Sequence, residues 1–444
     1  MGLTLEEFQE MCEGHGVHTV EVATPDTYGH LRGKRVPVDR FFATAHNSAL
    51  GMADAIFVMD MHNDLPDNEF INMDSGYLDC HLHADVSTGR ILSHRPGYAL
   101  VFADAYAPNG NLHPLSPRTV LKNQIAKCGE VGLDPVVATE LEFYLCTPDW
   151  QLVQEHIQYS SLMDALPLED VLADMRQALL GAGIDVESSN AEYGPGQIEI
   201  NAAYDGALRT ADNTALFKTI VKQVAVQHGL RATFMPKPWF EQSGSGMHVH
   251  TSLQADGANV FASSDGAPNE LMSKWLGGLL KHASSLSLLG APTANGPRRV
   301  QPYTFAPTHI HWGLDNRTVL ARCIVEADSP ANRVEFRAAG ADANAYLIIA
   351  GLLAAGVDGV SKSLDPGPMS EGDKYTEPGD ASALPTTLAD GIAAYTGSEL
   401  ASAMGEMFST SYVSIAAAEV EHAAEHAATD DVNDWERSRY IEFS

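Results

Sequence analysis

Three short segments each place two chemically active side chains two residues apart. They are TELEFYL with Glu140 and Glu142, GMHVHTSL with His248 and His250, and RVEFRAAG with Glu335 and Arg337. Their β-branched and aromatic neighbours favour strands. Because side chains two apart on a strand point to the same face, each pair is expected to project together into one cleft.

A fourth segment, NAEYGPGQIEIN, adds Glu192 and Glu199 on either side of a Gly-Pro-Gly turn. The four segments together offer five carboxylates and two imidazoles, and no thiolate. This donor set suits Mg²⁺ or Mn²⁺ better than Zn²⁺, and a cation would offset the repulsion that raises the pKa of crowded carboxyl groups. A single Glu-x-Glu is more often a solvent-facing strand edge, so the prediction of a metal centre depends on the combination.

Arginines gather in one stretch of an otherwise acidic chain. Six of them fall between positions 298 and 337, namely Arg298, Arg299, Arg317, Arg322, Arg333 and Arg337. The guanidinium fork suits carboxylates and phosphates, although any one of these arginines could instead form a surface salt bridge. Carboxylates able to hold metal, together with such a cluster, are the parts needed for phosphoryl transfer from ATP. The chain has no Walker A motif, so a P-loop enzyme is excluded.

The first part of the chain contains the strands expected to carry a polar loop. Residues 17–41 read as two strands joined by a loop with Asp26 and Tyr28, and residues 97–110 as a further strand and turn. Ser116 then stands as a helix N-cap before Pro117. The sequence therefore predicts domains over residues 1–107 and 108–444.

The larger part mixes the site-bearing strands with helices. Residues 168–183 and 211–229 show apolar residues at helical spacing and stop at glycine, and the tail from 383 onward is Ala-rich and predicted helical. Strands and helices that do not alternate regularly indicate the α+β class.

The bulk composition excludes several kinds of partner. The net charge is −31, from 58 acidic and 27 basic residues, which disfavours nucleic acid and anionic membranes. The apolar runs are too short for a bilayer and the acidic N-terminus is unlike a signal peptide, so a cytoplasmic protein is expected. The acidic surface fits a saline habitat or ordinary solubility equally well. The five scattered cysteines predict reduced, buried thiols.

Taken in order, the segments resemble the class I glutamine synthetase family over nearly the whole chain. The matching motifs are DTYGHLRGK, SPRTVLK, ELEFYL, EYGPGQIEIN, ATFMPKPW, SGSGMHVHTSL, NRTVLAR and RVEFRAAGADANAYL. The resemblance implies a small β-grasp N-terminal domain and a larger catalytic domain with a curved antiparallel sheet flanked by helices. It also implies a homo-oligomer, a dodecamer of two hexameric rings, with each active site between one subunit's sheet and the neighbour's N-terminal domain.

The resemblance further implies a role for each matching position, with ATP as co-substrate and two or three Mg²⁺ (or Mn²⁺) ions per site. The metal nearer glutamate and the amine would be held by Glu142, Glu192 and Glu199. The metal nearer the ATP phosphates would be held by Glu140, His248 and Glu335. L-glutamate would contact Gly244, Arg299 and Arg337. ATP would lie along Glu187, His250, Ser252, Arg322 and Arg333. The reacting groups would be assisted by Arg317 at the phosphate, by Glu192, and by Asp26 of the neighbouring subunit as the amine's base.

Two positions and one stretch depart from the pattern of ammonia-using members. Phe305 stands where they carry a glutamate, and Tyr28 where they have a small residue or lysine. The stretch between Cys146 and Leu168 is short, which leaves Tyr159 as the aromatic expected near the amine. An apolar wall suits an alkylammonium better than bare ammonium, through cation–π contact and desolvation. The sequence therefore predicts ATP-dependent ligation of a small alkylamine, methylamine first, to the γ-carboxylate of glutamate.

Several alternatives to this prediction stay open. The amine could be ethanolamine, a polyamine or ammonia, and Phe305 could be an apolar plug between subunits. A catalytically silent structural or regulatory oligomer is a remote alternative, because all six metal-ligand positions are intact.

Overall fold

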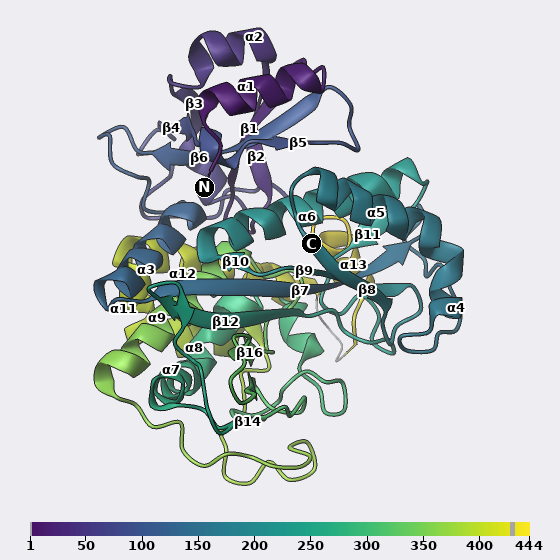
Figure 1. The fold of residues 1–444 in the computed structure, drawn as a ribbon, viewed down its shortest axis with the longest axis vertical. Coiled ribbons are helices and arrows are strands. Elements are labelled where there is room, and N and C mark those ends of the chain that lie inside the picture. Colours follow the sequence, from purple (N-terminus) through teal and green to yellow (C-terminus); the bar gives the residue numbers. More distant parts are fainter. Residues whose placement is uncertain (1, 427–430) are drawn as a thin grey trace.

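The computed structural model describes residues 2–426 and 431–444 and contains two sheets (Figure 1). The N-terminal sheet has six strands in the order β2-β1-β6-β4-β3, with β5 beside β6. Its strands are β1 (Thr19–Pro25), β2 (Leu31–Pro37), β3 (Leu50–Ala53), β4 (Asp79–Ala84), β5 (Arg90–Ile91) and β6 (Tyr98–Tyr106). Strand β1 runs parallel to β6 and the other pairs are antiparallel. Helices α1 (Leu5–Gly14) and the short α2 (Val38–Arg40) belong to the same part.

Strands β1 and β2 form the predicted hairpin around the polar loop. The Asp26 N–H donates to the His30 carbonyl at 2.9 Å and the Gly29 N–H to the Asp26 carbonyl at 2.9 Å. Gly29 has φ +86°, which a glycine adopts without strain. The hairpin therefore holds Asp26 beside Asn344 of the larger part, whose side chain donates to the Asp26 carbonyl at 3.1 Å.

The second sheet has ten strands in the order β14-β15-β16-β12-β7-β9-β8, with β10 and β11 beside β7 and β13 beside β12. Its strands are β7 (Asp134–Cys146), β8 (Val186–Ala191), β9 (Gln197–Ala202), β10 (Asp205–Gly206), β11 (Arg231–Thr233), β12 (Met247–Ala255), β13 (Ala258–Asn259), β14 (Trp312–Leu314), β15 (Ala321–Ile324) and β16 (Arg333–Phe336). All pairs are antiparallel except β14 with β15. The predicted antiparallel sheet is thus confirmed apart from this one parallel pair.

Strand register brings the site residues together. His248 on β12 lies opposite Glu140 on β7, and Glu142 lies opposite Glu199 on β9. His250 lies opposite Glu335 on β16. The strand prediction is confirmed for all of these residues.

Arg337 differs from its prediction by one residue, since it follows the end of β16 instead of lying on the strand. Its backbone N–H still donates to the Leu320 carbonyl at 3.0 Å. Residues 338–340, Ala-Ala-Gly, still run beside the start of β12, since the Met247 N–H donates to the Ala339 carbonyl at 2.9 Å and Gly340 forms an isolated antiparallel bridge with Gly246.

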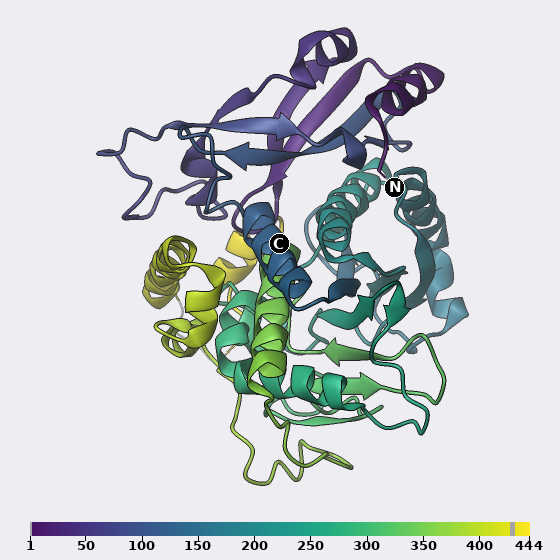
Figure 2. The same ribbon diagram turned by 60° about the vertical axis from the view of Figure 1, so that its left-hand side comes forward.

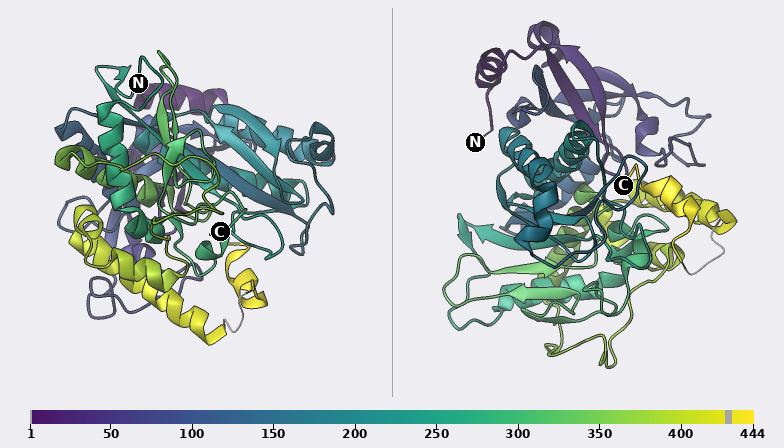
Figure 3. Two further views of the ribbon diagram at one scale, coloured as in Figure 1. Left: turned by 90° about the horizontal axis from the view of Figure 1, so that it is seen from below. Right: turned by 90° about the vertical axis from the view of Figure 1, so that its right-hand side faces the viewer.

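Helices cover the sheets and join the two parts (Figures 2 and 3). They are α3 (Pro117–Glu130), α4 (Leu162–Ala165), α5 (Glu169–Gly181), α6 (Ala207–Gln227), α7 (Glu270–Lys281), α8 (Ala283–Gly290), α9 (Ala345–Lys362), α10 (Leu388–Tyr395), α11 (Glu399–Met404), α12 (Glu406–His426) and α13 (Asp434–Tyr440). The α+β class and the helical tail are confirmed. Ser116 stands before α3 as expected, but its hydroxyl makes no capping hydrogen bond.

Helix α9 is the one described helix that is long and apolar enough to cross a membrane, and 72% of its apolar window is buried inside the protein. Its apolar character is explained by its place in the core between α3 and α7. The five cysteines are buried and unpaired, as predicted.

Candidate active site

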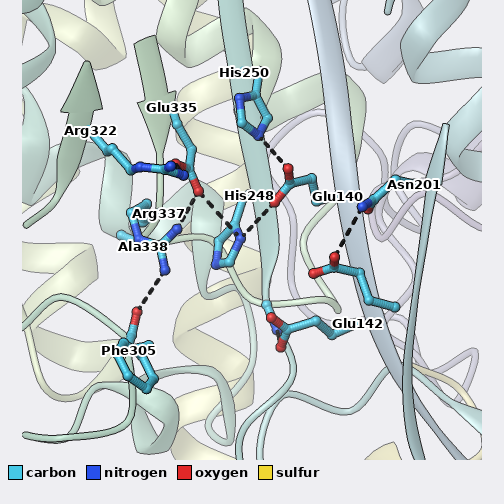
Figure 4. A network of polar contacts seen from close by, with 12 residues as sticks. Glu140, Glu142, Asn201, His248, His250, Phe305, Arg322, Glu335, Arg337 and Ala338 are labelled. Atoms are coloured by element: carbon cyan, nitrogen blue, oxygen red, sulfur yellow. Dashed lines mark hydrogen bonds and ion pairs between the residues drawn. The ribbon is translucent and has the colours of Figure 1, made fainter. Parts of the chain in front are cut away.

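Glu140 is the centre of a carboxylate–imidazole network between β7 and β12 (Figure 4). One carboxylate oxygen lies 3.2 Å from His248 Nδ1, and the other lies 2.9 Å from His250 Nε2. Burial alone would raise the pKa of Glu140, but the hydrogen bonds from the two imidazoles hold it well below its usual range. Glu140 is therefore an anion with one imidazole beside each of its carboxylate oxygens.

Glu335 extends the network to the arginines. Its side chain is fully buried, lies 3.5 Å from His248 Nδ1, and accepts hydrogen bonds from Arg337 and, at 2.8 Å, from Arg322. Burial would raise its pKa, but Arg337 and the two histidines lower it to about 2. A buried carboxylate of this kind is stable only because its partners surround it.

A second group of carboxylates lies beside the first, and in two of its members the pKa is raised instead of lowered. Burial, with repulsion from Glu140 and Glu142, raises the pKa of Glu199 to about 8. Burial and the Glu142 carboxylate likewise raise the pKa of Glu192 to about 7. Asparagines donate hydrogen bonds to both acids, Asn190 to Glu192 at 2.9 Å and Asn201 to Glu199 at 3.0 Å. The charge of Arg317 lowers the pKa of Glu192 but does not offset the effects that raise it.

Both groups fit a divalent cation. Ligand atoms of Glu140, His248 and Glu335 lie within 4.8 Å of one another, and so do those of Glu142, Glu199 and His248. The donors are carboxylate oxygens and one shared imidazole, the set that Mg²⁺ and Mn²⁺ prefer. The first group matches one predicted metal site. The second group contains two of the three residues predicted for the other metal site, Glu142 and Glu199. The third, Glu192, lies close enough to Glu142 for that carboxylate to raise its pKa.

Arg299 and Gly244, both predicted to contact glutamate, lie side by side. Arg299 is buried and lies 3.4 Å from His248 Nε2, while its other nitrogen donates to the Arg337 carbonyl at 3.2 Å. Its pKa is lowered by burial. A Cβ on Gly244 would lie 2.9 Å from the Arg299 side chain, so only glycine leaves the arginine its place.

A cavity of about 230 Å³ opens beside the first carboxylate group. Among the residues that line it are Glu187, His250, Ser252 and Arg333, all predicted to lie along ATP, and Glu140 joins the cavity to the metal-binding group. Tyr204 and Asn259 line it too, and sequence reasoning missed them because neither stands in a charged motif.

Arg322, the fifth residue predicted along ATP, does not line this cavity. It pairs with Asp315 and, at 2.8 Å, with Glu335. Strand β15 places it over the buried carboxylate, one strand away from the cavity.

The loop over residues 301–307 is irregular, as its two prolines predict, and it presents Phe305 to solvent with 43% of the residue exposed. Phe305 has φ +58°, a left-handed conformation that bulky residues rarely adopt. Its carbonyl accepts a hydrogen bond from Arg337 at 3.2 Å. The loop is therefore tied to the same arginine that holds Glu335.

Phe305 contacts a ring that sequence reasoning missed. The Tyr193 ring lies 5.8 Å from Phe305 and stacks on Tyr159 at 4.7 Å. Tyr193 directly follows Glu192, so its position beside a predicted ligand was the available signal. Tyr159 and Phe305, both predicted near the amine, are brought to the same place by this third ring.

Two predicted residues lie elsewhere in the chain that the structure describes. Asp26 is buried in its own hairpin and pairs with Arg32 at 2.7 Å. Tyr28 is 6% exposed, and burial together with Glu419 raises its pKa well above the ordinary value. The side chains of Asp26 and Tyr28 are both covered by their own chain, so the place of Tyr28 in a neighbour's amine pocket stays a prediction, like that of Asp26. Arg317 is exposed, and its charge lowers the pKa of Glu192 against the larger effect of burial.

Comparisons with known proteins agree with this geometry. The family of the glutamine synthetase catalytic domain matches residues 114–440. A glutamate–isopropylamine ligase from a Pseudomonas species is 34% identical, over 98% of this chain and 97% of its own. The γ-glutamylethanolamide synthetase GlnA4 of Streptomyces coelicolor is also 34% identical, over 99% of this chain and 96% of its own.

A solved GmaS–ADP complex superposes with a TM-score of 0.84 at 28% identity, covering 97% of this chain and 98% of that one. The match in sequence therefore extends over nearly all of the fold, including the carboxylate strands. This chain belongs to the glutamine synthetase family and is an ATP-dependent ligase.

Proposed function

We propose that this enzyme joins a short-chain primary amine, with methylamine as the first candidate, to the γ-carboxylate of L-glutamate. ATP transfers its γ-phosphoryl group to that carboxylate, giving γ-glutamyl phosphate and ADP. The amine nitrogen then attacks the acyl carbon, loses a proton, and phosphate leaves with the C–O bond electrons. The products are a γ-glutamylamide, ADP and phosphate.

The observation that carries the amine assignment is the ring stack beside Glu192. Phe305, Tyr193 and Tyr159 form a set of contacting, partly exposed rings, and Tyr193 directly follows Glu192 in the chain. At such rings an alkylammonium gains both burial of its alkyl group and cation–π attraction. Two relatives whose names specify isopropylamine and ethanolamine support an organic amine over ammonia. Methylamine is placed first because it carries the smallest alkyl group that such rings could cover.

The cleft supports a division of roles among its residues. Arg299 and Arg337 are suited to hold the glutamate carboxylates, and Gly244 leaves room for its backbone end. Glu187, His250, Ser252 and Arg333 line the cavity proposed for ATP, with Arg322 acting through Glu335. Arg317, near Glu192, is suited to the transferred phosphoryl oxygens.

The carboxylate groups are proposed to hold two or three Mg²⁺ or Mn²⁺ ions, which when bound would offset charge on the phosphoryl oxygens. Glu140, His248 and Glu335 would hold one ion, and Glu142, Glu192 and Glu199 another. The residues do the positioning themselves: strand register sets their spacing before any ion binds.

Asp26 is proposed as the amine's base in a neighbouring subunit's site, within a dodecamer of two hexameric rings. The family resemblance supports this arrangement, as does the place of Asp26 in a loop separate from the carboxylate cluster. We also propose a cytoplasmic location, without nucleic acid or membrane as a partner.

The proposal is tested with purified enzyme, ATP, Mg²⁺ and glutamate, by following ADP release with methylamine, ethylamine, isopropylamine, ethanolamine, putrescine and ammonia. We expect the highest kcat/KM with methylamine. A higher kcat/KM with ammonia than with every organic amine would overturn the assignment. ADP release that occurs without glutamate and without amine would contradict the proposed ligase reaction as well.

A further inference from the structure

A further cavity, of about 460 Å³, is lined by residues from both parts of the molecule. The N-terminal part contributes Arg35 on β2 and Arg95, which precedes β6. The larger part contributes residues of α6 and β11, together with Trp150 and Glu442. No residue lines both this cavity and the one proposed for ATP, and none of the residues predicted for the active site lines it. The cavity is therefore separate from the candidate active site.

Positive charge dominates the lining of this cavity. Its cationic residues are Arg35, Arg95, Lys222 and Arg231, and its one acidic residue is Glu442. The whole chain has the opposite balance, with 58 acidic and 27 basic residues. A concave surface lined by one sign of charge concentrates ligands of the other sign. In a protein of net charge −31, such a lining points to an anion as the ligand.

The arginines of the cavity have few acidic partners of their own. Arg35 and Arg95 share a single carboxylate, that of Glu21, at 2.8 and 3.1 Å. Arg231 forms no ion pair with any residue that the structure describes, and its guanidinium lies 5.8 Å from the centre of the Trp150 ring. A guanidinium beside a ring keeps the N–H donors in its own plane, and these suit carboxylate and phosphate oxygens.

Lys222 likewise has no carboxylate partner among the described residues. Its ammonium group donates to the backbone carbonyl of Glu442 at 2.9 Å, which uses one of its three donors. Burial and the nearby charge of Lys218 lower the pKa of Lys222 to about 7, and the Glu442 carboxylate opposes this effect only in part. An anion in the cavity would stabilise the charged form of this lysine.

We propose that this cavity binds a small multivalent oxyanion, with phosphate and dicarboxylate groups as the two forms that this chemistry admits. The charged groups of the ligand would meet Lys222 and Arg231 from the larger part and Arg95 from the N-terminal part. The volume lies within the range of small-molecule sites, about 300–1,000 Å³. Because the lining residues come from both parts, a bound anion would join them and stabilise the folded chain.

Calorimetric titration of the purified enzyme tests the proposal. The enzyme is held with Mg²⁺ and saturating ADP, and inorganic phosphate and succinate are titrated separately at constant ionic strength. We expect saturable binding of at least one of the two, and the anion that binds identifies the preferred group. Arg231→Gln and Lys222→Gln should each raise the Kd about tenfold, which is the effect of losing a hydrogen bond to a charged group. Thermal unfolding of the parent should shift to higher temperature as that anion is added.

A matched control is Arg209→Gln. Arg209 lies on α6, as Lys222 does, but it forms an exposed pair with Asp205 at 3.0 Å and does not line the cavity. The same loss of charge there should leave the Kd at the parent value. Arg35→Gln should raise the Kd about twofold to fivefold, since the Arg35 side chain is 69% exposed. It carries the test if Arg231→Gln and Lys222→Gln do not fold.

Three outcomes would overturn the proposal. The first is a folded parent that binds neither anion. The second is a Kd that is unchanged in the folded cavity variants, because the anion would then bind elsewhere, for example at the active site. The third is loss of assembly in Arg231→Gln when the parent binds neither anion, which would assign the cavity to a carboxylate of a neighbouring subunit. Failure of the proposed function would leave this inference standing, because binding is measured without turnover.

Discussion

Phe305 is the residue on which the proposed preference for an organic amine chiefly depends. It lies on a loop tied to Arg337 and has a left-handed φ of +58°. Such a conformation costs of order 1–3 kcal/mol, which surrounding contacts must offset. A ring here supplies an apolar wall, whereas a carboxylate would supply oxygens and a charge for ammonium.

We expect Phe305→Ala to lower kcat/KM for methylamine by between about twofold and thirtyfold, the range of a cation–π contact. Phe305→Glu should move preference towards ammonia, since it adds an acceptor and removes the apolar wall. Initial rates with methylamine and with ammonia, measured for the parent and for each variant, test both expectations. Tyr303→Glu places the same charge on the same loop outside the stack and should leave the preference unchanged. A KM for methylamine that stays constant in Phe305→Ala would take Phe305 out of the amine site.

Helix α9 links the core of the catalytic part to the loop that carries Asp26. Its N-cap residue, Asn344, accepts a hydrogen bond from the Tyr346 N–H and donates to the Asp26 and Thr27 carbonyls at 3.1 and 3.0 Å. Asn344 is buried, so both carbonyls depend on it. The position of Asp26 is therefore set by an element more than 300 residues away in the chain.

Asn344→Asp keeps the cap acceptor but removes both donors, so we expect a loss of about 2 kcal/mol or more in the free energy of unfolding. If Asp26 serves as the amine's base, kcat/KM for methylamine should fall as well. Urea unfolding and steady-state rates measure the two effects.

Asn269→Asp is the matched control for this change. Asn269 caps α7 and donates to the Val260 and Ala262 carbonyls at 2.8 and 3.0 Å, far in the chain from Asp26. It should lose stability while kcat/KM for methylamine in the folded enzyme stays at the parent value. An equal fall in both variants would mean that Asn344 acts only through stability.

The two parts of the whole molecule are joined by buried charge. Arg118 on α3 is fully buried and pairs with Asp104 of the N-terminal sheet, with Asp85 at 3.0 Å and with Asp212 on α6 at 3.2 Å. One guanidinium thus contacts carboxylates from both parts. The boundary at residues 107–108 stays a prediction, although the two sheets end and begin on either side of it.

Arg118→Leu would leave three carboxylates without their shared cation, so we expect it to lower the free energy of unfolding by about 3–5 kcal/mol. Arg209→Leu, which breaks an exposed pair with Asp205, should cost under about 1 kcal/mol. Urea unfolding of both variants measures the difference.

The effect of Arg118 also depends on pH. Burial would raise the pKa of Asp85, but hydrogen bonds from Ser87 and Arg118 lower it. A lowered folded pKa stabilises the fold above the unfolded pKa and loses that effect as the pH falls. The difference in the free energy of unfolding between the parent and Arg118→Leu should therefore decrease below about pH 4. A difference that increases there would contradict the pairing of Arg118 with Asp85.

The sequence by itself determined which residues stand on the site-bearing strands and which reaction family they serve. The alternation around Glu140, His248 and Glu335 is local, and a period of two residues is enough to place a pair on one face. The hairpin around Asp26, the irregular loop around Phe305 and the helices were predicted for similarly local reasons.

Only the tertiary structure decided which of these faces meet. Strand register placed Glu142 opposite Glu199, and three chain segments far apart in sequence brought Tyr159, Tyr193 and Phe305 into one stack. In the tertiary structure Tyr28 is covered by its own chain, and Arg322 pairs with Glu335 instead of lining the cavity. The physical reason is that contacts between distant segments depend on register and packing, which no local pattern contains.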